Sequence, residues 1–170
     1  MRIEKDTMGE MKVPDDSYYG AQTQRAFQNF QVSDLKIPRP MIASIAMIKR
    51  SASIVNHKLG FFDSKIKDAI VRACDEVIQG KFDNQFIVDI YQTGSGTSSN
   101  MNANEIIANR ACEILSGKKG NKSLVHPNDH VNLGQSSNDV IPTSIHIAAT
   151  LELSKRLIPE LKLLEKSLDN

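Results

Sequence analysis

Tryptophan is absent from this sequence of 170 residues, and aromatic residues make up only 5% of it. The core must therefore consist mainly of aliphatic side chains, which favours helix packing over a sheet sandwich. Cysteine is also scarce, since Cys74 and Cys112 are the only two and lack the spacing of a metal site. We expect both to be reduced, buried thiols of an intracellular protein.

The sequence also lacks a strong excess of charge, because 21 Lys and Arg residues balance 20 Asp and Glu residues. This balance gives no reason to expect nucleic acid or an anionic membrane as a partner. The first residues, MRIEKDTMGEMK, contain no apolar signal-peptide core, and no later apolar run approaches membrane-spanning length. We therefore expect a soluble, cytoplasmic protein.

The N-terminal residues predict a short extended arm followed by a short helix. Residues 2–14 contain Gly9, end at Pro14 and scatter their apolar side chains among charges, which suits a hairpin-like arm. Asp15 or Asp16 could cap a short helix through residues 18–30.

Apolar residues at spacings of three and four predict two longer helices that pack as an antiparallel pair. The first begins near Pro40 and ends at Gly60, and the second is capped by Asp63 and ends at Gly80. Together with the scarcity of aromatic residues, this pair indicates a mainly α fold.

A glycine- and hydroxyl-rich turn, TGSGTSSN at residues 93–100, precedes a predicted helix that ends at Ser116, before Gly117. Glycines let the backbone come close to a ligand, and a helix N-terminus favours a carboxylate or phosphate. The turn matches neither the phosphate-binding loop nor the dinucleotide fingerprint. In this helix we expect Glu105 and Arg110 to form surface or interface pairs.

A second polar segment, residues 126–143 (HPNDHVNLGQSSNDVIPT), combines histidines, amides and hydroxyls with few apolar residues. It can be a capped turn, with Asn138 or Asp139 starting a long helix, or a binding segment. Both polar segments open a helix, so they could converge on a small dicarboxylate. Beyond the second segment a leucine stripe continues through Pro159, which should kink the helix or start a new one.

Three long segments carry a resemblance to a known family: residues 2–26, residues 92–111 (QTGSGTSSNMNANEIIANRA) and residues 125–148 (VHPNDHVNLGQSSNDVIPTSIHIA). The sequence resembles the N-terminal part of class II fumarate hydratases, in the aspartase/fumarase superfamily. Aspartases more often carry Ala and Thr where this sequence has Ser95 and Ser137, so aspartate ammonia-lyase is the alternative. The resemblance implies a helical N-terminal domain at residues 1–137 and, at residues 138–170, the first long helix of a central helical bundle.

The resemblance also implies reversible addition of water to fumarate to give L-malate, without metal or organic cofactor. A base would remove a proton next to a carboxylate, and the dianionic carboxylate that forms must be stabilised. In the first segment, Ser95 and Thr97 would bind a substrate carboxylate and Gly96 would let the backbone approach. In the second, the implied substrate-binding residues, acting from another subunit of a homotetramer, are Ser136, Ser137 and Asn138.

A second dicarboxylate site is implied by His126, Pro127, Asn128 and Asp129. In the family this site draws on basic residues just upstream, where this sequence has Ser123 and Leu124, with Lys122 as the nearest charge. Alternatively, His126 is a histidine at a helix start that is bonded to the backbone.

The family's catalytic His and Ser motifs do not occur in this sequence, so no catalytic residue is assigned. We expect the chain to be about the first third of such an enzyme and to be catalytically silent alone. The competing interpretation is a non-enzymatic helical module that binds dicarboxylates or associates through its leucine face.

Overall fold

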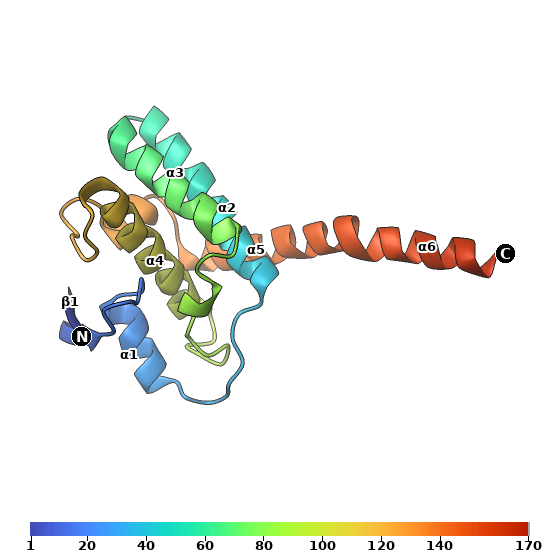
Figure 1. The fold of residues 1–170 in the computed structure, drawn as a ribbon, viewed down its shortest axis with the longest axis horizontal. Helices are drawn as coiled ribbons and strands as arrows, with labels where there is room; N and C mark the ends of the chain where they lie inside the picture. The colour runs from blue at the N-terminus through green and yellow to red at the C-terminus, as the bar shows by residue number, and fades with distance from the viewer. Residues whose placement is uncertain (170) are drawn as a thin grey trace.

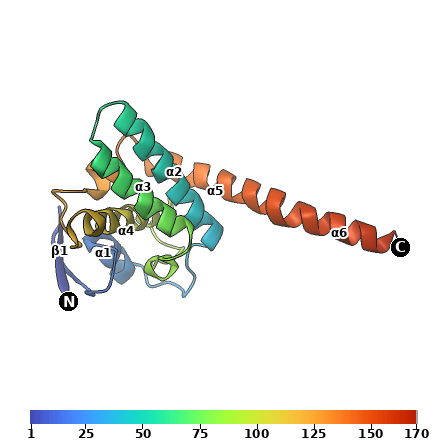
Figure 2. The same ribbon diagram turned by 45° about the horizontal axis from the view of Figure 1, so that its top comes forward.

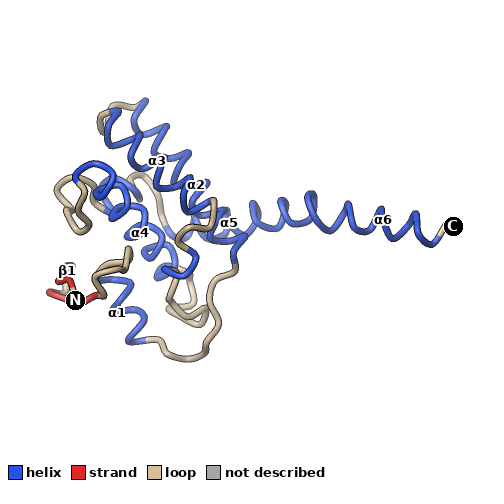
Figure 3. Tube along the Cα trace, viewed as in Figure 1, coloured by secondary structure: helices blue, strands red, loops and turns tan. Residues whose placement is uncertain are grey.

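The computed structural model describes residues 1–169, and helices dominate its regular structure (Figure 3), which confirms the mainly α fold. In chain order the elements are β1 (Arg2–Asp6), β2 (Gly9–Val13), α1 (Ala21–Asn29), α2 (Arg39–Lys58), α3 (Ser64–Ile78), η1 (Asp83–Gln85), α4 (Thr97–Ser116), η2 (Pro127–Val131), α5 (Ser137–Glu152), η3 (Leu153–Leu157) and α6 (Ile158–Leu168).

The predicted N-terminal arm is an antiparallel hairpin in which Arg2 pairs with Val13 and Asp6 pairs with Gly9. Gly9 has a φ of 116°, a conformation that glycine adopts readily at a turn. The Arg2 guanidinium donates to the carbonyl oxygens of Ser17 (3.0 Å) and Tyr19 (3.2 Å), so the hairpin is fastened to the segment before α1.

Helix α1 is capped by a distant side chain and not by Asp15 or Asp16, so the expected cap is wrong. The carboxylate of Glu105, on α4, accepts the amide N–H groups of Gly20 (2.8 Å), Gln22 (3.0 Å) and Thr23 (3.0 Å). Because Glu105 is only 2% exposed, the expected surface pair is also wrong. An acidic group at a helix N-terminus satisfies amides that lack intrahelical partners.

Helices α2 and α3 form the predicted antiparallel pair and contribute much of the core (Figure 1). The Asp63 carboxylate accepts the Ile66 amide (2.9 Å), and Gly60 and Gly80 follow the two helices with positive φ. Buried side chains at the centre are Ile45, Ile70, Ala73, Val77, Ile106 and Ile107. Cys74 and Cys112 are free and buried, as predicted.

Helix α5 packs against α2 and α4 at its start, and its end continues into α6 as a long arm that extends away from the rest of the chain (Figures 1 and 2). The π-helical turn η3 joins them, and Pro159 lies in the first turn of α6. Because Glu152, Leu157 and Ile158 keep right-handed helical backbone angles, the helix continues through this region with a change of type, and the predicted new start is not seen. Apolar side chains on this arm are about half exposed, among them Leu153, Leu157, Leu161 and Leu164. In the part of the chain that is described, no helix is both long and apolar enough to cross a membrane.

Candidate functional site

Helix α4 begins at the glycine- and hydroxyl-rich turn, and its backbone shape depends on glycine. Gly94 and Gly96 have φ values of 81° and 74°, and Gly96 is the N-cap residue of the helix. Ser95 and Thr97 share a hydrogen bond between their hydroxyls (2.9 Å). The Gln92 side chain accepts the Ser99 amide (3.0 Å), and Ser99 is buried while Ser95 and Thr97 are exposed.

Helix α5 begins beside the start of α4. Its cap is Ser136, whose hydroxyl accepts the Asn138 amide (3.2 Å), so the predicted caps Asn138 and Asp139 lie two and three residues too late. The Ser137 hydroxyl is hydrogen-bonded to the Thr97 hydroxyl (3.0 Å). The two polar segments, expected to serve a site from different subunits, thus meet within one chain.

The hydroxyls of Ser95, Thr97 and Ser137 form one chain of hydrogen bonds, which we call the hydroxyl cluster. Ser95 and Thr97 are exposed and Ser137 is partly exposed, so a ligand can reach them. The cluster lies at two helix N-termini, where partial positive charge favours an anion. Such an arrangement can hold a carboxylate through short hydrogen bonds without Lys or Arg.

Close packing of glycine against isoleucine brings the two helix starts together. A Cβ added at Gly96 would lie 2.8 Å from Cγ1 of Ile141, in the first turns of α5. A larger residue at position 96 would therefore force the side chain of Ile141 to move.

The histidine of the second predicted site caps η2, as the alternative interpretation of His126 expects. Its Nδ1 accepts the amides of Asn128 and Asp129, both at 3.2 Å, and lies 3.2 Å from a carboxylate oxygen of Asp129. Because the amides occupy Nδ1, Nε2 is the ring nitrogen that can still donate to a ligand. The His130 ring accepts the His126 amide (2.8 Å), and burial lowers the pKa of His130.

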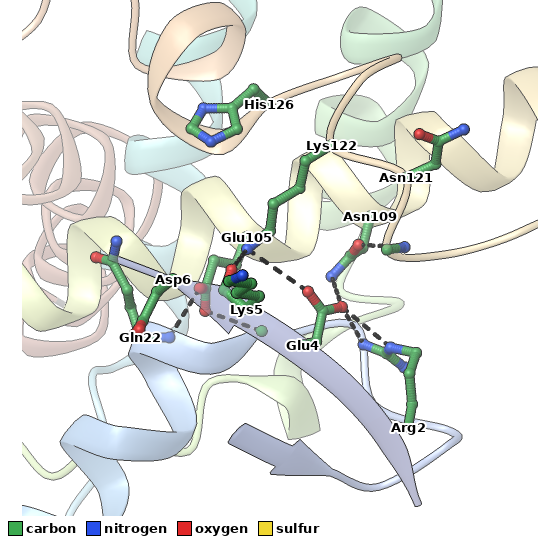
Figure 4. A network of polar contacts seen from close by, with 12 residues as sticks. Arg2, Glu4, Lys5, Asp6, Gln22, Glu105, Asn109, Asn121, Lys122 and His126 are labelled. Atoms are coloured by element: carbon green, nitrogen blue, oxygen red, sulfur yellow. Dashed lines mark hydrogen bonds and ion pairs between the residues drawn. The ribbon is translucent and has the colours of Figure 1, made fainter. Parts of the chain in front are cut away.

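A cavity of about 380 Å³ adjoins His126, and segments far apart in the sequence line it (Figure 4). Lys122 crosses from the loop before η2 to the hairpin, where its Nζ donates to the Lys5 carbonyl and lies 3.7 Å from the Glu4 carboxylate. The lining residues are Lys5, Asp6, Thr7, Gln22, Met101, Glu105, Lys122, His126, Pro127 and Asn128.

Lys5 and Gln22 are lining residues that sequence reasoning missed. They come from the hairpin and α1, and no spacing in the sequence links them to His126. Asp129 is an exposed residue that does not line this cavity, so only part of the predicted second site is brought together around it.

The comparison with family models gives a match to residues 9–170 for a family described as lyase. The chain belongs to this lyase family. Among curated relatives, the class II fumarate hydratase of Campylobacter jejuni is 56% identical over 160 residues, which cover 94% of this chain and 35% of the relative. The mitochondrial fumarate hydratase of Saccharomyces cerevisiae is 54% identical, over 99% of this chain and 35% of that relative.

Solved structures give the same result for the fold. A class II fumarase from Schistosoma mansoni superposes with a TM-score of 0.91 at 47% identity, covering 95% of this chain and 34% of that one. The chain thus spans about a third of the length of the relatives it matches. The resemblance to class II fumarate hydratases is confirmed, as is the helical fold that it implies.

Proposed function

We propose that this chain is part of a fumarate hydratase, which adds water reversibly to fumarate to give L-malate. The observation that carries the proposal is the 3.0 Å hydrogen bond between Thr97 and Ser137, because it joins two helix starts into one carboxylate-binding surface. The relatives named fumarate hydratase support the choice of substrate.

In this proposal the hydroxyl cluster and Asn138 hold one carboxylate of the substrate, with Ser136 shaping the turn. In the dehydration direction, a base removes a proton from the carbon of L-malate next to that carboxylate, which puts a further negative charge on the carboxylate before hydroxide leaves the adjacent carbon. The hydroxyls and the partial charges of two helix N-termini are aimed at it before the reaction starts, so they stabilise this charge without reorganising. Gly96 contributes its backbone to the proposed site, since a φ of 74° favours glycine, while the side chain of Ile141 fills the space that a Cβ would take.

We also propose that His126, Pro127, Asn128 and Asp129 contribute to a second dicarboxylate site. Support comes from the cavity beside His126, which Lys5 and Lys122 line together with the acidic residues Asp6 and Glu105, whereas Ser123 and Leu124 do not line it. Nε2 of His126 is available to donate to a carboxylate there.

The finer organisation is also part of the proposal. A domain boundary falls between residues 137 and 138, at the start of α5, and the protein works as a cytoplasmic homotetramer. The exposed apolar face of α5 and α6 supports association, because covering half-exposed leucines with a partner lowers the free energy.

We also propose that the 170-residue chain alone is catalytically silent, since the family's catalytic motifs do not occur in it.

The test compares two proteins: the 170-residue chain and the product of the longest reading frame that contains it. Loss of fumarate absorbance is expected for the second and not for the first. Ser137→Ala should lower kcat/KM by about 10-fold or more, as expected when one charge-stabilising donor is removed. Ser116→Ala, at the other end of α4, is the matched control. Ammonia-dependent loss of fumarate without hydration would instead indicate an aspartate ammonia-lyase, the alternative.

A further inference from the structure

The side chain of Asn132 makes three hydrogen bonds at the loop between η2 and α5. Its Oδ1 accepts hydrogen bonds from Nζ of Lys49 (2.6 Å) and from Nδ2 of Asn100 (3.2 Å). Its own Nδ2 donates to the carbonyl of Gln135 (3.0 Å), the residue before the Ser136 cap. Asn132 therefore links three separate parts of the chain: α2, α4 and the approach to α5.

The lysine that donates to Asn132 is fully buried. Lys49 has an exposed fraction of 0%, and desolvation by burial lowers its pKa from 10.5 to about 7. Burying an amine is costly unless it gains a good acceptor, and Asn132 provides one. A second anchor from α2 lies nearby, because Asn56 donates to the Leu133 carbonyl (3.0 Å). The loop is thus fixed to α2 at two successive residues.

The contacts of Asn132 lie about one helical turn from Thr97 on α4 and from Ser137 on α5. Asn100 follows Thr97 in the first turn of α4, and Asn132 precedes Ser136 by one short turn. A change at Asn132 would therefore alter the separation of Thr97 and Ser137, although Asn132 is not part of the cluster.

We propose that Asn132 is a positioning residue for carboxylate binding: through Lys49, Asn100 and Gln135 it sets the distance between the starts of α4 and α5. This inference rests on the proposed function, because it assigns the hydroxyl cluster to the substrate. Asn132 acts through the cluster and touches no reacting atom.

The competing explanation is that Asn132 only stabilises the fold, and a matched pair of variants separates the two roles. Asn132→Ala removes the shared acceptor. Asn109→Ala removes another amide that makes three contacts, to Glu4 (3.5 Å), to the Tyr18 carbonyl (2.9 Å) and from the Gly120 amide (2.8 Å), but lies toward the hairpin. Both should lower the melting temperature, so stability alone does not separate them.

The deciding kinetic measurement is the split between KM and kcat for fumarate in the full-length protein. Asn132→Ala should raise KM by about 10-fold or more, because the displaced hydroxyls bind the substrate carboxylate less tightly, and it should lower kcat as well, because the same hydroxyls stabilise the charge that develops on it. Asn109→Ala should leave KM unchanged. Equal KM values for the two variants would overturn the proposal. If Asn132→Ala does not fold, Asn132→Asp, which keeps the acceptor and loses the donor to Gln135, should show a smaller rise in KM.

A crystal structure of the Asn132 variant provides a readout that needs no activity. The distance between the Thr97 and Ser137 hydroxyls should increase from 3.0 Å to beyond hydrogen-bonding reach, about 3.5 Å. An unchanged distance contradicts the positioning role. Absence of fumarate hydration by the unaltered full-length protein would instead contradict the proposed function. The distance between the Thr97 and Ser137 hydroxyls in the variant would still decide the role of Asn132.

Discussion

At the scale of single residues, two buried charged side chains hold segments that lie far apart in the sequence. Glu105 caps α1 from α4, and Lys49 fixes the loop before α5 from α2. Both are buried almost completely, so each needs the partners that it has. Removing either side of such a contact leaves a polar group without a partner in the interior, which costs more than the contact contributes.

For Glu105, we expect Glu105→Ala to lower the free energy of unfolding by about 3 kcal/mol, since three amides lose their acceptor. Glu105→Gln keeps one acceptor oxygen and should cost less. Urea denaturation followed by circular dichroism measures both values. Equal losses for the two variants would contradict the capping role, because only the first removes every acceptor.

For Lys49, we expect a pH-dependent contribution to stability. Its folded pKa, about 7, lies below the usual 10.5, so between these values the unfolded chain binds the extra proton. Stability due to this group therefore rises as pH increases from 7 towards 10.5. Relative to Lys49→Met, the unaltered protein should gain on the order of 3 kcal/mol between pH 7 and pH 10. Urea midpoints of both proteins across that range measure the gain, and a constant difference would show that Lys49 does not change protonation on folding.

At the scale of elements, the site depends on where helices begin. Helices α4 and α5 start side by side, with Gly96 of one against Ile141 of the other, so their first turns present hydroxyls to the same space. The hairpin and α1 likewise bring Lys5 and Gln22 to the cavity beside His126 (Figure 4). Helix packing therefore assembles both candidate sites from short polar segments.

We expect Gly96→Ala to disturb the start of α4 in two ways. A φ of 74° costs a residue with a Cβ about 1–2 kcal/mol, and the new Cβ would also collide with Ile141. Gly60→Ala is the control, because Gly60 has a φ of 84° with nothing within 4 Å of an added Cβ. Thermal unfolding should show a larger loss for position 96, and fumarate binding should weaken there alone. Equal losses of thermal stability in the two variants would mean that the side chain of Ile141 moves aside at no energetic cost.

At the scale of the whole molecule, the arm formed by α5 and α6 carries an apolar face that the rest of the described chain leaves half exposed (Figures 1 and 2). Each buried leucine contributes roughly 1.5–3 kcal/mol, so covering several drives association strongly. We therefore expect the apolar face of this arm to bind another protein surface.

We expect the purified 170-residue chain to self-associate through this face. Replacing Leu157, Leu161 and Leu164 together by Gln should shift it towards a monomer, because the apolar area available for burial falls. Sedimentation velocity at several concentrations gives the measurement, with Lys162→Gln as a control on the same helix. A monomeric unaltered chain with an ordered α6 would refute the expectation.

Local pattern was enough to predict most elements of the fold. Spacing of apolar residues, Asp63 as a cap and the glycines at 60, 80 and 117 located three helices closely, because each signal acts within one or two turns. The cap of α1 was mispredicted, since its acceptor lies more than eighty residues away in the sequence. Local propensity carries no information about such a partner.

By itself, the sequence determined the helical fold, the family and the two polar segments, since all three are written in residue types and their spacing. Only the tertiary structure decided that Thr97 and Ser137 meet, that Lys5 and Gln22 join His126 around a cavity, and that Asn132 links both helix starts. The physical reason is that these contacts depend on packing between helices. Packing fixes distances of a few ångströms between residues that no sequence period connects.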